Sequence, residues 1–312
     1  MHAPFFERIL GDLNHSVKCR VAVPFAQDEA CAYAVGRAIK MGILSATLIG
    51  NPDLIRKLYG DETMKNGIQI VSEADQTTAC KIAVQLVKEG KADILMKGLV
   101  PTSTLLKAVL NSKDGIKKNP LLSHLLFFEA KAYPGVRVMT DAAVNISPDA
   151  DALSRIVENS AEALGLFERR PLRIALLAAN EKVSDKVLST VLARKVSQGF
   201  SEREDILVEG PISLDLALSP ESAEIKKYNG RIRGNADIFV VPRIEAGNAF
   251  YKSLHYYSEA ALGGIVFGAK CPVVLTSRAD NNDTKFNSLL LGSVLWQRAL
   301  PAPGEPSKES HQ

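Results

Sequence analysis

The feature that most constrains this chain is a repeated alternation along the sequence. Short apolar runs rich in β-branched residues are each followed by a longer segment with helical spacing of its apolar residues. This order is typical of α/β proteins, in which mainly parallel sheets are flanked by helices. The nearly continuous apolarity of the runs indicates strands that are buried on both faces. In the first half we expect strands over 21–25, 46–49, 68–72, 93–96, 122–128 and 136–140, and helices over 28–41 and 75–88.

The second half repeats the pattern and indicates a second sheet. Between the last two strands of the first half, the sequence Ala132-Tyr133-Pro134-Gly135 is a turn signature, so these strands are expected to form an antiparallel hairpin. Further strands are expected over 174–178, 206–208, 238–241, 264–267 and 273–275.

The end of the chain is predicted to be a helix followed by a tail. Over 284–300, apolar residues at Phe286, Leu290, Val294 and Leu300 give the helix a face that needs a surface to cover. Residues 301–312 are rich in Pro, Ser and charge, which predicts a frayed tail. A chain of 312 residues is too long for one simple core, so we expect two domains, or one domain with a large insert.

Composition argues against several functional classes. The net charge is only +3 and the basic residues are scattered, so nucleic acid is not an expected partner. No apolar run approaches the roughly 20 residues of a membrane span and the N-terminus lacks a signal-peptide core, so no membrane association and a cytoplasmic location are expected. The four cysteines are far apart without a Cys-x-x-Cys pair, and the histidines lack ligand spacing. We therefore expect neither a disulfide framework nor a metal site.

Polar residues follow several predicted strands, at the edge where α/β sheets place ligands. The run after 93–96 is Lys97-Gly98, followed by Thr102-Ser103-Thr104 at the start of a helix. A cation, a glycine and hydroxyls in this order suit an anion such as phosphate. The alternative is that Thr102 or Ser103 only caps the helix and that Lys97 is solvated.

Three further junctions carry polar side chains. They are Asp141 to Asn145, Asn180-Glu181-Lys182, and Arg243 to Asn248, where Gly247 would let a ligand approach closely. Asp141 and Asn180 could instead simply cap helices.

The strand over 273–275 is followed by a hydroxyl and a guanidinium, Ser277 and Arg278. Arginine offers a planar fork that pairs with both oxygens of a phosphate. The alternative is an ion pair between Arg278 and Asp280 or Asp283. No Gly-x-x-x-x-Gly-Lys-Ser/Thr loop is present, and no Gly-x-Gly-x-x-Gly follows the first strand, so neither a nucleoside triphosphatase nor an ordinary dinucleotide dehydrogenase is predicted.

Six runs at these junctions resemble, in the same order, motifs of the phosphate acetyltransferase and phosphate butyryltransferase family. The similarity extends over about residues 21–295. The last run, continued through Lys285, Asn287 and Ser288, is more similar to the butyryltransferase branch. The runs are Lys97-Gly98 with Thr102-Ser103-Thr104, Thr140 to Asn145, Asn180 to Val183, Val208 to Pro211, Ile244 to Asn248, and Pro272 to Asp280.

The resemblance implies two α/β domains with a cleft between them and a homodimer. Residues 142–277 would form a second domain inserted into a first domain of residues 1–141 and 278–302, with 303–312 as a flexible tail. It also implies reversible transfer of a short acyl group, butyryl or acetyl, according to acyl-CoA + phosphate = acyl phosphate + CoA. CoA or acyl-CoA is then a substrate, and no bound cofactor or metal is needed.

The resemblance also assigns roles to residues. A Ser-Arg pair at the reacting centre corresponds to Ser277 and Arg278, where Arg278 would bind the phosphoryl group and Ser277 the thiol or the developing oxyanion. Asp280 or Asp283 would accept the thiol proton. Phosphate and CoA binding is assigned to Lys97, Gly98, Thr102, Ser103, Thr104, Lys107, Asn145, Asn180, Glu245, Gly247 and Asn248.

This chain departs from the family pattern at a few positions. Arg243 stands where relatives commonly carry Asp, and Lys107 stands where the acetyl branch tends to have Arg, so Lys107 would hold phosphate as a point charge. Thr284 occupies one plausible register of the expected acid, which leaves Asp280 and Asp283 as alternatives.

Two other functions stay open. The first is a fold relative that acts on another phosphorylated acid, because similar two-domain folds serve hydroxy-acid dehydrogenases; the absence of a metal-binding carboxylate cluster argues against it. The second is a non-catalytic CoA-binding subunit, for which Arg243 is the only hint.

Overall fold

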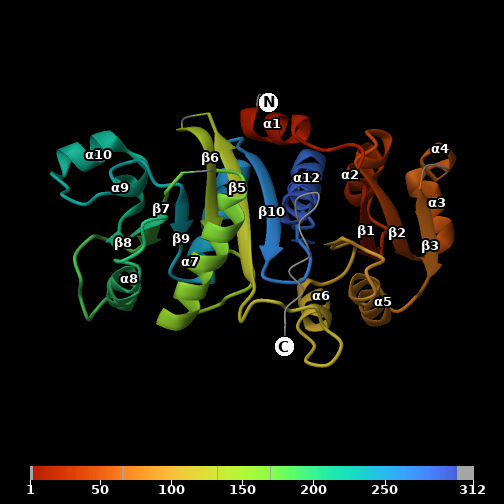
Figure 1. The fold of residues 1–312 in the computed structure, drawn as a ribbon, viewed down its shortest axis with the longest axis horizontal. Coiled ribbons are helices and arrows are strands. Elements are labelled where there is room, and N and C mark those ends of the chain that lie inside the picture. Colours follow the sequence, from red (N-terminus) through yellow and green to blue (C-terminus); the bar gives the residue numbers. More distant parts are fainter. Residues whose placement is uncertain (1–2, 65–66, 132, 169, 301–312) are drawn as a thin grey trace. The chain divides into compact units, whose positions relative to one another are not determined.

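The computed structural model describes residues 3–64, 67–131, 133–168 and 170–300. The chain forms two compact units (Figure 1). We call residues 117–269, with the N-terminal residues up to Phe5, the inserted unit. We call Phe6–Ile116 and Lys270 onward the flanking unit. The expected tail over 301–312 lies outside the described residues.

The flanking unit contains a parallel sheet with the strand order β3-β2-β1-β4-β11. Helix α2 joins β1 to β2, and α5 joins β3 to β4, so the two connections run in opposite directions across the strand order. Because both crossovers are right-handed, α2 and α5 lie on opposite faces of these strands. The contacts agree, since α12 packs on α2 and α6 packs on α5. The elements are β1 (Cys19–Pro24), α2 (Glu29–Lys40), β2 (Leu44–Gly50), α3 (Pro52–Tyr59), α4 (Asp61–Met64), β3 (Ile68–Ser72), α5 (Gln76–Lys88), β4 (Ile94–Met96), α6 (Thr102–Val109), β11 (Val273–Val274) and α12 (Asn282–Ala299), with α1 (Pro4–Gly11) at the N-terminus.

The strand order reverses direction between β1 and β4, which makes their carboxyl ends a topological switch point. Open α/β sheets bind ligands at such points. The chain is tightly packed here, because a Cβ atom on Gly98 would lie 2.4 Å from the carbonyl oxygen of Pro24 and 2.6 Å from that of Phe25. Only glycine therefore fits at this position, where the loop after β4 crosses the end of β1.

The last helix, α12, has the apolar face that the sequence predicts. Phe286, Leu290 and Val294 are buried, whereas Leu300 is exposed. The helix packs against α2, β4 and β11 of the flanking unit. This apolar face therefore covers a surface of the flanking unit that is formed by α2 and by the strands β4 and β11.

The inserted unit contains the strand order β10-β5-β6-β9-β7-β8. Strands β6, β9, β7 and β8 are parallel, and β5 runs antiparallel to both β6 and β10. Its elements are β5 (Ser123–Ala130), β6 (Tyr133–Thr140), α7 (Ala150–Gly165), β7 (Leu172–Leu177), α8 (Leu188–Gly199), β8 (Ile206–Ile212), α9 (Leu214–Leu218), α10 (Pro220–Ile225), β9 (Ile238–Val240), α11 (Ile244–Tyr256) and β10 (Ala261–Phe267).

The predicted α/β class is confirmed, and each predicted strand is present. The antiparallel hairpin is also confirmed, but the turn lies earlier than predicted. Ala130 pairs with Tyr133, so Pro134 and Gly135 belong to β6 and not to the turn; Ala132 lies outside the described residues. The ladder shifts its register between Phe128 and Ala130, opposite the Pro-Gly sequence.

The limits of the compact units differ from the expected domain limits of 142 and 277. Strand β5 pairs with β10, and β6 pairs with β9, so the hairpin belongs to the inserted unit. The strand at 273–274 pairs with β4 and belongs to the flanking unit. Whether either unit folds as an independent domain stays a prediction. Within the described residues, no helix is long and apolar enough to cross a bilayer.

Candidate active site

Two chain segments leave the sheet of the flanking unit side by side. Strand β11 pairs in parallel with β4, with Val274 opposite Met96, and the backbone N–H of Lys97 donates to the carbonyl of Val274 at 2.9 Å. Lys97 and the run from Thr276 to Asp280 therefore follow adjacent strands at the same sheet edge. The sequence placed both segments at strand ends, and the structure brings them together.

The turn after β11 is held by a carboxylate. The backbone N–H of Ser277 donates to Oδ2 of Asp280 at 2.7 Å, and the N–H of Asp280 returns a bond of 3.3 Å to the carbonyl of Ser277. Asp280 is buried, whereas Arg278 is exposed at the tip of this turn. The Asp280 carboxylate thus helps to fix the backbone that presents Ser277 and Arg278.

The alternative ion pair of Arg278 is not formed. Asp283 is exposed in the first turn of α12 and pairs with Arg37, at 3.4 Å between Nη1 and Oδ1. Within the described residues, Arg278 has no carboxylate partner. Its guanidinium is therefore available to an anion in solution.

Lys97 is a buried lysine without a carboxylate partner in the described part of the chain. The residue is only 7% exposed, and Nζ donates two long bonds of 3.4 Å to the carbonyls of Gly98 and Val100. Burial lowers the pKa of the Lys97 amine below the ordinary 10.5, and the nearby charges of Lys285 and Arg278 lower it further. The solvated Lys97 of the alternative interpretation is therefore wrong.

Lys285 and Asp28 complete this charged cluster, and neither was identified as a site residue from the sequence. Lys285 is 4% exposed, and its Nζ lies 2.7 Å from Oδ1 of Asp28. Asp28 also accepts the N–H of Cys31 as the N-cap of α2. The available signals were a lysine in the first turn of a helix with an apolar face, and an acid in the short loop between β1 and α2.

Helix α6 begins at Thr102, directly after the short loop that follows Lys97. The N-cap residue is Pro101, which supplies no side-chain hydrogen bond to the helix. Thr102, Ser103 and Thr104 form the first helical turn. The capping role considered for Thr102 or Ser103 is therefore not observed, and a helix N-terminus without a capping side chain attracts anions.

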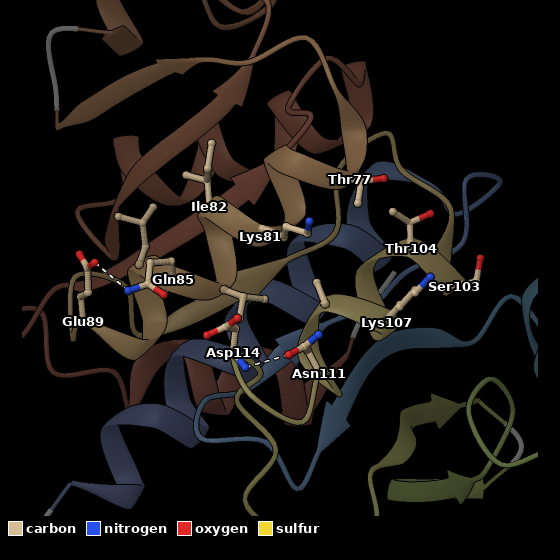
Figure 2. Close-up of a pocket in the computed structure, with 13 residues that line it drawn as sticks. Thr77, Lys81, Ile82, Gln85, Glu89, Ser103, Thr104, Lys107, Asn111 and Asp114 are labelled. Atoms are coloured by element: carbon tan, nitrogen blue, oxygen red, sulfur yellow. Dashed lines mark hydrogen bonds between the residues drawn. The ribbon is translucent and has the colours of Figure 1, made fainter.

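A pocket of about 1000 Å³ lies between α5 and α6 (Figure 2). Ser103, Thr104 and Lys107 line it from α6, and Thr77 and Lys81 line it from α5. The remaining lining residues include both apolar and polar groups. They are Ile82, Val84, Gln85, Leu86, Glu89, Ala108, Asn111 and Asp114. Two ammonium groups and three hydroxyls beside an apolar wall suit a ligand with both a phosphate and a flat apolar part.

In the inserted unit, Asp141 and Asn145 are engaged with each other and with backbone. Oδ1 of Asp141 accepts the N–H groups of Ala143 and Val144 at 2.8 Å each, and Oδ2 accepts the N–H of His124 at 2.9 Å. The amide nitrogen of Asn145 donates to Oδ2 of Asp141 at 2.7 Å and to a backbone carbonyl at 2.8 Å. Both side chains therefore hold the loop after β6.

The other predicted residues of the inserted unit occupy separate positions. Oδ1 of the exposed Asn180 accepts the N–H of Lys182 at 3.0 Å, a local turn bond. Glu245 lines a pocket of about 660 Å³ together with Arg243, and Asn248 is exposed on α11. These three side chains remain accessible to solvent.

Gly247 accommodates the protein's own backbone. A Cβ atom there would lie 2.5 Å from the carbonyl oxygen of Asp141 and 3.0 Å from Cα of Ala142. The close approach that glycine permits at this position is therefore made by the loop after β6, where the sequence analysis expected a ligand.

Comparison with known proteins places these motifs in a family. Residues 59–292 match the family model described as phosphate acetyl/butaryl transferase. The chain is 39% identical over 294 residues to phosphate butyryltransferase of Clostridium acetobutylicum, covering 93% of this chain and 97% of that protein. It is 32% identical to phosphate acetyltransferase of Rhizobium meliloti, covering 95% of each chain. The crystal structure of a branched-chain phosphotransacylase from Enterococcus faecalis superposes with a TM-score of 0.81 at 37% identity, covering 89% of this chain and 99% of that one.

Proposed function

The chain belongs to the phosphate acetyl/butaryl transferase family, and on this basis we propose that it catalyses reversible transfer of a short acyl group between CoA and inorganic phosphate. The observation that carries this proposal is the charge arrangement at the carboxyl edge of β4 and β11. Arg278 and the buried Lys97 lie there without carboxylate partners among the described residues. The uncompensated guanidinium of Arg278 at a sheet edge suits a reaction in which phosphate and acyl phosphate bind and leave.

The proposed reaction is a direct transfer in a ternary complex. The CoA thiolate attacks the carbonyl carbon of the acyl phosphate, the bond from that carbon to the phosphate oxygen breaks, and phosphate leaves with the electron pair. Arg278 binds the phosphoryl group, and Ser277 donates a hydrogen bond to the sulfur or to the developing oxyanion. Orientation and charge stabilisation supply most of the rate increase.

We assign the phosphates of CoA to the pocket between α5 and α6. Ser103, Thr104 and Lys107 project into it from the first turns of α6, and Lys81 faces them from α5 (Figure 2). The N-terminus of α6 lacks a capping side chain, so it adds a partial positive charge. A volume of about 1000 Å³ is large enough for a nucleotide.

We further propose that the acyl group has about four carbons. The relative named phosphate butyryltransferase is 39% identical, whereas the relative named phosphate acetyltransferase is 32% identical. Burying two further methylenes contributes about 1.6 kcal/mol, or about a fifteenfold preference for butyryl over acetyl.

Location and assembly follow the family. We propose a homodimer in the cytoplasm without a bound cofactor. All four cysteines are free thiols, which fits a reducing compartment. Light scattering of the purified protein gives its mass directly, and a mass of one chain would contradict the dimer.

The function is tested by measuring thiol release from acetyl-, propionyl-, butyryl- and isobutyryl-CoA with and without phosphate. We expect release that saturates with phosphate and is fastest with the four-carbon substrates. Equal or faster release from acetyl-CoA would contradict the butyryl assignment alone. CoA binding without release from any of the four substrates would support a non-catalytic CoA-binding subunit instead.

A further inference from the structure

We propose that Lys97, and not Asp280 or Asp283, accepts the proton of the CoA thiol. This inference rests on the proposed function, and it replaces the carboxylate that the sequence suggested as the base. It also gives the buried amine at the end of β4 a chemical role.

The two carboxylates are poorly placed to act as bases. Asp280 accepts the backbone N–H of Ser277 at 2.7 Å, so its carboxylate is engaged in holding that turn. Asp283 is exposed, with 77% of its side chain accessible, and it pairs with Arg37. A carboxylate that is solvated or committed to a backbone bond is a weak acceptor for a thiol proton.

The surroundings of Lys97 suit a neutral amine. A neutral amine has two N–H groups and one lone pair, and two carbonyl oxygens, those of Gly98 and Val100, lie within 3.4 Å of Nζ. An ammonium group would need a third acceptor. The amine can therefore donate both of its hydrogens to the backbone and keep its lone pair available.

Three charged groups face Lys97, and each comes from a different segment of the flanking unit. Two cations, Arg278 after β11 and Lys285 on α12, oppose protonation, and one carboxylate, Asp28 before α2, favours it. Asp28 is already paired with Lys285 at 2.7 Å. The remaining neighbours are the thiols of Cys31 and Cys80, whose pKa values burial raises to about 12 and about 11, so neither supplies an anion near neutral pH.

The proton transfer balances within the reaction. The S–H bond of CoA breaks and an N–H bond forms on Lys97, while the sulfur electron pair attacks the acyl carbon. The carbon–oxygen bond to phosphate then breaks, and the new ammonium group gives its proton to the leaving phosphate. Lys97 ends as a neutral amine, and the products are acyl-CoA and hydrogen phosphate. In the reverse direction the same lysine takes the proton from phosphate and returns it to the thiolate.

The test is the pH dependence of kcat/KM for CoA in the presence of acyl phosphate. In the wild type, protonation of Lys97 produces a fall at low pH. Lys97→Met should lose about 100-fold in kcat at neutral pH, and its rate should rise with each pH step as hydroxide removes the proton instead. Lys97→Arg retains a charge but cannot act as the base, so it should not restore the rate. Asp280→Asn and Asp283→Asn should still show the fall in kcat/KM at low pH, even if their maximal rates are reduced.

Neighbouring charges provide a second readout. Lys285→Met removes a cation and should move the low-pH fall to higher pH, whereas Lys91→Met, which changes an exposed lysine of the same unit, should not move it. In the wild type alone, warming should move the fall to lower pH, because ammonium ionisation is strongly endothermic and carboxyl ionisation is nearly athermal. This last measurement needs no variant and is unaffected by folding of the mutants.

The assignment is overturned if Lys97→Arg has nearly wild-type kcat, if either Asp→Asn variant loses the low-pH fall, or if the fall does not move with temperature. A wild-type protein with no acyl transfer at any pH would contradict the proposed function itself. The two failures are therefore distinguishable.

Discussion

The strand ends of the flanking unit and those of the inserted unit carry polar residues in the same sequence pattern, yet they differ in what those residues do. In the inserted unit, Asp141 accepts three backbone N–H groups and the amide of Asn145. In the flanking unit, Lys97 has only two long bonds to carbonyls, and Arg278 has no carboxylate partner among the described residues. Satisfied polar groups stabilise a loop, whereas buried or uncompensated cations cost stability and remain available for chemistry.

Glu209 strengthens this contrast. It lies in β8 within another of the motif runs, and its carboxylate accepts the N–H groups of Arg231 and Ile232 at 2.8 and 2.9 Å, and the hydroxyl of Tyr228. The motif residue is thus an anchor for the loop before β9. Family motifs in the inserted unit therefore include residues that maintain the fold, and a motif match alone does not identify a catalytic group.

The comparison predicts its largest effect at Asp141. Asp141→Ala leaves buried N–H groups without an acceptor and should lower the free energy of unfolding by about 3 kcal/mol. Asp149→Ala removes an exposed N-cap of α7 and should cost only about 1 kcal/mol. Denaturant unfolding of both variants measures the difference. Equal losses in the free energy of unfolding would mean that the buried hydrogen bonds of Asp141 stabilise the protein no more than an exposed helix cap does.

Arg278→Lys should change activity with little effect on stability. Lysine keeps the charge but loses the bidentate fork, so kcat/KM for phosphate should fall roughly tenfold, or about 1.4 kcal/mol. The control is Arg56→Lys, on the exposed surface of α3, which should leave the kinetics unchanged. Unchanged steady-state constants for phosphate in folded Arg278→Lys would remove Arg278 from the site.

Lys97→Met should stabilise the protein, the opposite sign to Asp141→Ala. The folded state lowers the pKa of Lys97, so between that value and the ordinary 10.5 the unfolded chain binds more protons and stability rises with pH. The destabilisation is complete below the folded-state pKa and is absent above the unfolded-state pKa. Methionine removes this effect, and we expect a gain of about 1 kcal/mol near neutral pH. A loss of stability at that pH would show that Lys97 serves the fold.

The smallest effect is expected at Asp283. Its ion pair with Arg37 is long, and 77% of the carboxylate side chain is exposed. Asp283→Asn should therefore change the free energy of unfolding by less than about 0.5 kcal/mol. A larger loss, measured by denaturant unfolding at low and high salt, would show a structural role for this pair.

Much of this organisation could be predicted from the sequence, because apolar runs and their polar ends are local signals. The predicted strands are all present, and Lys97, Ser277 and Arg278 lie at the strand ends where they were expected. The family was also predicted correctly, since its motifs are local runs.

The remaining features depend on distant contacts. A single lysine near the start of a helix usually reaches solvent, whereas Lys285 is buried and paired with Asp28, 257 positions away in the sequence. Gly247 gave a local signal of close approach, but the approaching group is the backbone of the loop after β6. Periodicity and motif spacing do not contain this information.

The central claim is that this protein transfers an acyl group to inorganic phosphate, and the most direct measurement is identification of the product. Butyryl-CoA, phosphate and the purified protein are incubated together and followed by ³¹P NMR. The account predicts a new acyl phosphate resonance that grows in proportion to the free CoA thiol and is absent without the protein. Release of CoA with no acyl phosphate formed, or no reaction with any acyl-CoA, would contradict it.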